Sequence, residues 1–180
     1  MEPKKIAEKY RDTARLFISD AKKYTAEQFT KSPAEGQWSM AQIYHHIILV
    51  TDQCLANATL CIHGKGKKKS IAIGPAIFEL MGSFPPVKLK IKKFPNAVKH
   101  LYFPENISID AAISGLEKSI RKMEQALQLI SQAGTSMRVK HWAGGWFNAR
   151  QWYHSAEMHI RHHLRQKKRL DRFLAEQLKT

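Results

Sequence analysis

The chain has 180 residues, 43% of them hydrophobic, which suits one domain with a sizeable core and excludes a disordered protein. Lys and Arg number 30 against 15 Asp and Glu, so the formal charge of +15 favours anionic substrates or partners. No apolar run is long enough to cross a bilayer, and the polar start does not look like a secretory signal. We therefore expect a cytoplasmic protein with no membrane partner.

The first third of the chain predicts two amphipathic helices. The first runs from Lys4 to Tyr24, because apolar residues recur there at alternating spacings of three and four. Turn residues follow, and Ser39 with Gln42 forms a capping box that begins the second helix. Gly64 ends that helix. Its apolar stripe comprises Ile43, His46 with Ile47, Val50, Cys54, Ala58 and Cys61.

The two cysteines share this second helix. Cys54 and Cys61 are seven residues apart, which separates them by roughly 10 Å along the axis, too far for a disulfide. We interpret both as small buried hydrophobic residues. The alternative is a redox-active or metal-ligating thiol.

The segment 64–104 is the least regular part of the chain. It holds five of the seven prolines and two lysine clusters. A short helix is predicted at 76–81, and the alternation from Val87 to Lys92 favours an extended strand. A connection this long is uncommon in a compact domain and lets the helices on either side of it run parallel. Its role as a lid, a dimer arm or a linker stays open.

Two more helices are predicted in the second half. The third runs from Ser108 to Ala133, with Gly134 as its C-terminal cap, and the fourth runs from Asn148, in a capping box with Gln151, to Leu178. The inward stripe of the third helix is Ile109, Ile113, Leu116, Ile120, Met123, Leu127 and Ile130. The pattern predicts one all-α domain over 1–180, a four-helix bundle with a long crossover connection between helices 2 and 3.

The inward stripe of the fourth helix carries polar residues where the third helix is apolar. Burying a polar group without a partner costs roughly 1–3 kcal/mol, so these side chains need partners. His159 and His163, at i and i+4, can present two imidazoles to one divalent metal ion, and His46 is the best candidate for a third ligand. The competing interpretation is a chance spacing of satisfied core histidines. The stripe comprises Trp152, Ala156, His159, His163, Gln166, Leu170 and Phe173.

Several polar neighbours of these histidines receive supporting roles. Gln166 could orient an imidazole or bond a metal-bound water, or else satisfy a backbone carbonyl. His45 and His162 point off the stripe and are interpreted as surface or supporting groups. Glu157 is two residues from His159 and should face away from the stripe, so the site has no obvious general base.

Two segments resemble the metal motifs of the DinB-like (DinB/YfiT) superfamily. Residues 38–47, Trp-Ser-Met-Ala-Gln-Ile-Tyr-His-His-Ile, are similar to its first motif, in which a Trp-Ser/Thr pair opens the second helix. In that motif the histidine eight residues after the Trp, here His46, is a ligand. Residues 159–166 are similar to the second motif, HxxxH followed by Arg-Gln. The sequence departs from the family at Gln42, where many members have an acid, and at Trp142, where a subgroup has proline after the histidine.

The resemblance implies a four-helix bundle with a long crossover and one divalent ion, of the zinc or nickel type, held by His46, His159 and His163. Three imidazoles also suit copper and iron. Characterised members include thiol-dependent S-transferases and a maleylpyruvate isomerase. Bound metal lowers the pKa of water or a thiol, so we predict a metal-dependent thiol S-transferase or hydrolase. Its expected partners are a small, anionic substrate and a low-molecular-weight thiol.

Two other functions stay open. The first is a metal-binding bundle without catalysis, in which a helix face could form a homodimer. The second is a basic protein that binds nucleic acid non-specifically through three groups of cations. No known DNA-reading or single-strand motif is present, which argues against specific nucleic-acid binding. The cation groups are Lys65, Lys67, Lys68 and Lys69; Lys88, Lys90, Lys92, Lys93 and Lys99; and Arg161, Arg165, Lys167, Lys168, Arg169 and Arg172.

Overall fold

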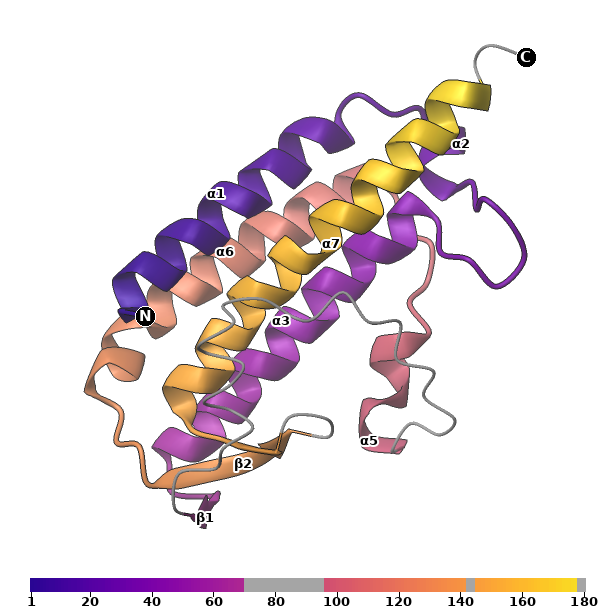
Figure 1. The fold of residues 1–180 in the computed structure, drawn as a ribbon. Coiled ribbons are helices and arrows are strands. Elements are labelled where there is room, and N and C mark those ends of the chain that lie inside the picture. The colour runs from indigo at the N-terminus through magenta and orange to yellow at the C-terminus, as the bar shows by residue number, and fades with distance from the viewer. Residues whose placement is uncertain (70–95, 142–144, 178–180) are drawn as a thin grey trace.

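A computed structural model describes residues 1–69, 96–141 and 145–177. In these parts of the chain, four long helices form the core and confirm the predicted all-α bundle (Figure 1). Each begins and ends within three residues of the predicted bounds, where those bounds are described. The helix predicted at 76–81 and the strand predicted at 87–92 lie outside the described residues. The long helices are α1 (Pro3–Ala21), α3 (Met40–Ile62), α6 (Ile109–Gln132) and α7 (Ala149–Gln177).

The four helices are arranged so that α1 and α3 each pack against both α6 and α7. In Figure 1, α1 and α7 run in one direction while α3 and α6 run in the other. The second and third long helices, α3 and α6, are therefore parallel, as a long crossover connection permits.

Buried tyrosines join the helices across the core. The Tyr10 hydroxyl lies 3.0 Å from the Thr51 hydroxyl, and the Tyr44 hydroxyl donates to the carbonyl of Phe17 at 2.6 Å. The Tyr153 hydroxyl likewise donates to the carbonyl of Met123 at 2.7 Å. A buried tyrosine thus fills core volume with its ring while its hydroxyl keeps a partner.

Side-chain caps fix where the helices begin. Ser39 and Gln42 form the predicted capping box of α3, with bonds of 3.0 and 3.1 Å between each side chain and the other residue's backbone N–H. Asn148 and Gln151 do the same for α7 at 3.0 and 2.9 Å. These contacts satisfy N–H groups that the first helical turn leaves without intrahelical acceptors.

The ends of α3 and α6 differ. Gly64 follows α3 with φ +70°, and the Lys65 N–H reaches back to the Leu60 carbonyl at 2.9 Å, which is a Schellman motif. The prediction that Gly134 caps α6 in the same way is wrong. Ala133 is the C-cap in an extended conformation and Gly134 has no positive φ, because the chain continues outward toward the next strand instead of reversing.

Short elements lie at the ends and along one side of the bundle (Figure 1). Helix α2 (Ala26–Thr30) precedes α3, and α5 (Asn96–Lys99) with the 3-10 turn η1 (His100–Tyr102) precedes α6. A three-stranded antiparallel sheet, in the order β1-β2-β3, lies where α3 ends and α7 begins (Figure 1). Its strands are β1 (Lys67–Lys68), β2 (Met137–His141) and β3 (Gly145–Phe147).

Both cysteines are buried and unpaired with each other, as predicted. Burial raises the pKa of Cys54 to about 12 and also raises the pKa of Cys61. The two thiols are therefore protonated at neutral pH and act as small apolar side chains. Among the described helices, none combines the length and apolar character that a membrane span requires.

Candidate metal centre

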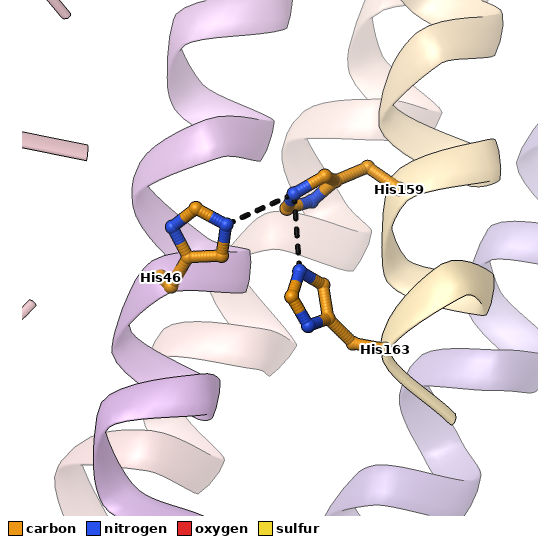
Figure 2. A group of neighbouring side chains, drawn as sticks. All are labelled: His46, His159 and His163. Carbon is orange, nitrogen blue, oxygen red and sulfur yellow. Dashed lines mark hydrogen bonds between the residues drawn. The ribbon is translucent and has the colours of Figure 1, made fainter. Parts of the chain in front are cut away.

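Three histidine side chains from two helices converge at one point between α3 and α7 (Figure 2). The Nε2 atom of His159 lies 3.0 Å from that of His46 and 3.1 Å from that of His163. One ring nitrogen from each residue lies within 4.8 Å of the other two. The structure thus brings together all three residues that the sequence indicated, and this group could hold a metal ion.

His46 is held from behind by the η1 turn. It lies in the second turn of α3 and is 4% exposed. Its Nδ1 is 2.5 Å from the Leu101 carbonyl, which can only accept, so Nδ1 carries the proton and Nε2 presents its lone pair. The Trp38 ring, at 4.7 Å between centroids, and the Tyr102 ring, at 6.0 Å, flank the imidazole.

His163 is oriented in the same way by Gln166. Its Nδ1 lies 2.9 Å from the amide oxygen of Gln166, which again leaves Nε2 as the lone-pair nitrogen that points to the centre. Gln166 therefore contacts an imidazole, which fits one of the roles left open for it. His162 lies edge-on to His163 at 5.4 Å between ring centroids and is not among the three converging residues.

The donor set fits a divalent ion. Two bonds of about 2.1 Å at a tetrahedral angle separate their donor atoms by about 3.4 Å, a few tenths of an ångström more than the observed 3.0 and 3.1 Å. Without an ion, the His159 Nε2 can donate one proton at most, so it cannot fully satisfy the two lone pairs that face it from His46 and His163. A cation between the three rings compensates all of them together.

Burial keeps the three imidazoles neutral. It lowers the pKa of His46 to about 4, against an opposing hydrogen bond to Leu101. Burial and repulsion from neighbouring imidazoles hold the pKa of His159 and of His163 well below 6.5. Neutral imidazoles bind a metal without first losing a proton. The His159 side chain as a whole is partly exposed, although its Nδ1 is buried.

A network around Gln42 secures the η1 turn that holds His46. The Gln42 amide accepts the Ser39 N–H and donates to the Pro104 carbonyl at 3.0 Å. His45 accepts the Glu105 N–H at 3.0 Å, so it also ties down the segment after η1. A carboxylate at position 42 could accept but not donate, which gives a physical reason for the amide in this chain.

A buried polar cluster on another face of α7 was missed by sequence reasoning. Glu157 does face away from the histidines, but it is 0% exposed and bonded by Arg161 at 2.8 and 3.1 Å. His154 Nε2 lies 3.6 Å from the same carboxylate. The i, i+3 and i, i+4 spacings were the only sequence signal of this cluster.

His141 was given no role from the sequence, yet it is packed close to the site. Its ring stacks on Phe147 at 4.9 Å and contacts Trp152 at 5.1 Å. Burial lowers the pKa of His141 to about 4. The histidine of β2 therefore helps to join the sheet to the face of α7 that carries His159.

Residues 9–166 match the family model of the DinB superfamily, a range that includes both histidine motifs and most of the chain. The chain belongs to the DinB superfamily. No curated protein and no solved structure gives a significant match to it.

Proposed function

We propose that His46, His159 and His163 bind one divalent metal ion, zinc or nickel. The observation that carries this proposal is the convergence of three Nε2 atoms at 3.0 and 3.1 Å. The Leu101 carbonyl holds the imidazole of His46, and the Gln166 side chain holds that of His163. Each contact favours the tautomer that a metal requires, before any metal is bound.

We further propose that this centre is catalytic and acts in thiol S-transfer or in hydrolysis. A divalent ion lowers the pKa of a bound water or thiol to near neutrality, which supplies a nucleophile. Three protein ligands leave at least one position for such a group, as catalytic sites do. The partial exposure of His159 supports access from solvent.

The surroundings of His46 support a small-molecule substrate. A pocket of about 830 Å³ is lined by the Trp38 and Tyr102 rings that flank the His46 imidazole, and by Gln37, Phe103 and Asn106 among others, while none of the three histidines is among its lining residues. Binding sites for small ligands typically measure roughly 300–1,000 Å³. The net charge of +15 favours an anionic substrate or thiol.

The chain's own residues hold and orient in this proposal. Trp38 and Tyr102 would exclude water from one side of His46, and Gln166 would keep His163 fixed while the substrate enters. Glu157 is engaged by Arg161, so we assign it no proton transfer.

The test is a screen of the zinc-loaded and nickel-loaded proteins against low-molecular-weight thiols with electrophiles, and against small esters and amides. We expect thiol consumption or hydrolysis that disappears on chelation and in His159→Ala, and persists in His162→Ala. His162 is the matched control, because it is adjacent to a ligand but not among the three converging residues.

The alternative, a metal-holding bundle without catalysis, predicts a different result in the same screen. The loaded protein would then bind metal with full stoichiometry and turn over neither class of substrate. That outcome would remove the catalytic proposal and leave the metal site intact.

A further inference from the structure

The small sheet presents an aromatic ring and lysines on one face. In β1 and β2, Lys67 is directly opposite Arg138; in β2 and β3, Lys140 is directly opposite Trp146. Opposite residues in an antiparallel pair point to the same side, as do alternate residues along a strand. Lys67, Lys140 and Trp146 therefore share a face with Arg138. The Nζ atoms of Lys67 and Lys69 lie 5.9 and 5.6 Å from the centroid of the Trp146 ring.

We call Lys67, Lys69, Lys140 and Trp146 the cationic face. The other side of the sheet carries Val139 opposite Phe147, and Phe147 is buried in the bundle core. The three lysines of the cationic face are exposed and Trp146 is partly exposed, whereas Arg138 on the same side of the sheet is buried beneath them.

A buried arginine holds the cationic face rigid. Arg138 is 3% exposed and donates to the Lys69 and Trp146 carbonyls, each at 3.2 Å, and to the Gln151 side chain at 3.0 Å. These bonds join all three strand segments to the start of α7. Gly66 also fits closely, because a Cβ there would lie 2.5 Å from the Arg138 carbonyl oxygen.

No acidic residue that is close to these lysines in the sequence balances their charge. The chain has no Asp or Glu in residues 53–69 or 125–156, which include all three strands. Within the described residues, no ion pair involves a lysine of the cationic face. Mutual repulsion of like charges on a rigid surface disfavours the unliganded state and is relieved when a polyanion binds.

The basic residues of α7 are partly neutralised by comparison. Arg161 is paired with Glu157, and the nearly buried Lys167 is paired with Asp20 and Asp171. The spacing of the basic residues alone does not separate these cations from those of residues 65–69. The pairings leave the sheet as the better surface for phosphate groups.

We propose that the cationic face binds single-stranded nucleic acid without sequence specificity. Lysines contact backbone phosphates, and an accessible aromatic ring provides a platform on which a base stacks. The cationic face combines both features within three short strands. Its aromatic ring distinguishes this surface from a scatter of lysines, which would attract any anion equally.

The test is fluorescence anisotropy of the 180-residue protein with a labelled oligothymidylate at several salt concentrations. Three lysine–phosphate contacts predict a slope of log affinity against log salt of about −2, or a roughly twentyfold loss between about 50 and 200 mM salt. Lys67→Gln with Lys69→Gln should reduce the slope by about 1.4. Trp146→Ala should weaken binding about tenfold with little change in slope, and Trp146→Phe should restore most of it.

The matched control is Lys22→Gln with Lys168→Gln, which removes the same charge from exposed positions outside the sheet. It should bind like the wild type. No binding at about 50 mM salt, or an equal loss in the control pair, would overturn the proposal. So would binding to vesicles rich in phosphatidylserine, lost in the lysine pair, without oligonucleotide binding. The proposal is independent of the metal centre, so His159→Ala should leave the oligonucleotide affinity unchanged.

Discussion

At the scale of single residues, the metal centre depends on which ring nitrogen carries the proton. The Leu101 carbonyl and the Gln166 amide oxygen each accept from an Nδ1, so the Nε2 atoms of His46 and His163 present their lone pairs to the proposed metal site. Outer partners of this kind tune metal affinity without touching the metal.

Replacing Gln166 by Ala should lower zinc affinity about tenfold while leaving one site per chain, because His163 loses the acceptor that fixes its tautomer. Competition with a chromophoric chelator measures the affinity. Arg165→Ala, an exposed neighbour, is the control and should be neutral. Equal affinities in Gln166→Ala and the wild type would show that Gln166 does not support the site.

A second group of interacting residues joins the end of α1 to α7. Lys167 Nζ lies 2.7 Å from Asp20 and 2.8 Å from Asp171, whose carboxylate also accepts the Tyr24 hydroxyl. Burial alone would raise the pKa of Asp20, but the hydrogen bonds and charges of Lys167 and Lys23 outweigh it and keep this pKa below 3.8.

This shift predicts how stability depends on pH. A carboxyl group with a folded pKa below its unfolded pKa stabilises the fold above about pH 4, and that contribution is lost as pH falls through the folded pKa. Urea unfolding should therefore find Asp20→Asn less stable than the wild type near pH 6, with a smaller difference near pH 2.5. A difference that does not change with pH would mean that the ionised carboxylate contributes nothing.

At the scale of elements, the glycines that follow α3 and α6 differ in backbone conformation. Gly64 adopts a left-handed conformation in the Schellman motif after α3, whereas Gly134 does not. An added Cβ meets nothing within 4 Å at either position, so the backbone conformation is the main difference between them.

Gly64→Ala should lower the free energy of unfolding by about 1 kcal/mol, since L residues are strained at positive φ. Gly134→Ala should leave it unchanged or raise it by about 0.5 kcal/mol, by restricting the unfolded chain. Urea denaturation compares the two variants. A similar effect of both substitutions would contradict the distinction drawn between the two helix ends.

The long helices could be predicted from sequence because each buries a periodic stripe over many turns, and the capping boxes of α3 and α7 could be predicted from their residue types and spacing. The inward stripe predicted for α6 was nevertheless only partly right. Leu116, Met123 and Ile130 are buried, but Ile113 and Ile120 are only partly so, and the small residues Ala112 and Ser119 face the core instead. Small side chains let neighbouring helices approach closely. The spacing of apolar residues does not reveal which positions need a small side chain.

The short elements could not be predicted, since strands of two to five residues and the turn η1 carry no measurable period. This limits the site as well. His159 and His163 follow from the spacing on one helix, whereas the position of His46 depends on contacts with η1 and α7 that only the tertiary structure supplies. The family resemblance therefore contributed more than periodicity to the choice of His46.

At the scale of the whole molecule, the candidate centre joins α3 and α7, two neighbouring helices that are far apart in sequence (Figure 1). A ligand that binds only the folded state stabilises it by about 2.7 kcal/mol when present at 100 times its Kd. The homodimer considered from the sequence stays a prediction.

Chelation should therefore lower the Tm of the metal-loaded protein by roughly 5–10 °C. Differential scanning calorimetry with and without EDTA measures the shift. The same chelator should leave the Tm of His159→Ala unchanged, and an equal shift in that variant would place the stabilising metal elsewhere.

The most direct measurement of the central claim is the metal content of purified protein, reloaded with zinc and desalted, by elemental analysis. We predict one equivalent per chain in the wild type and in His162→Ala, and well below one equivalent in each of His46→Ala, His159→Ala and His163→Ala. Full stoichiometric metal in folded His159→Ala would contradict the site described here.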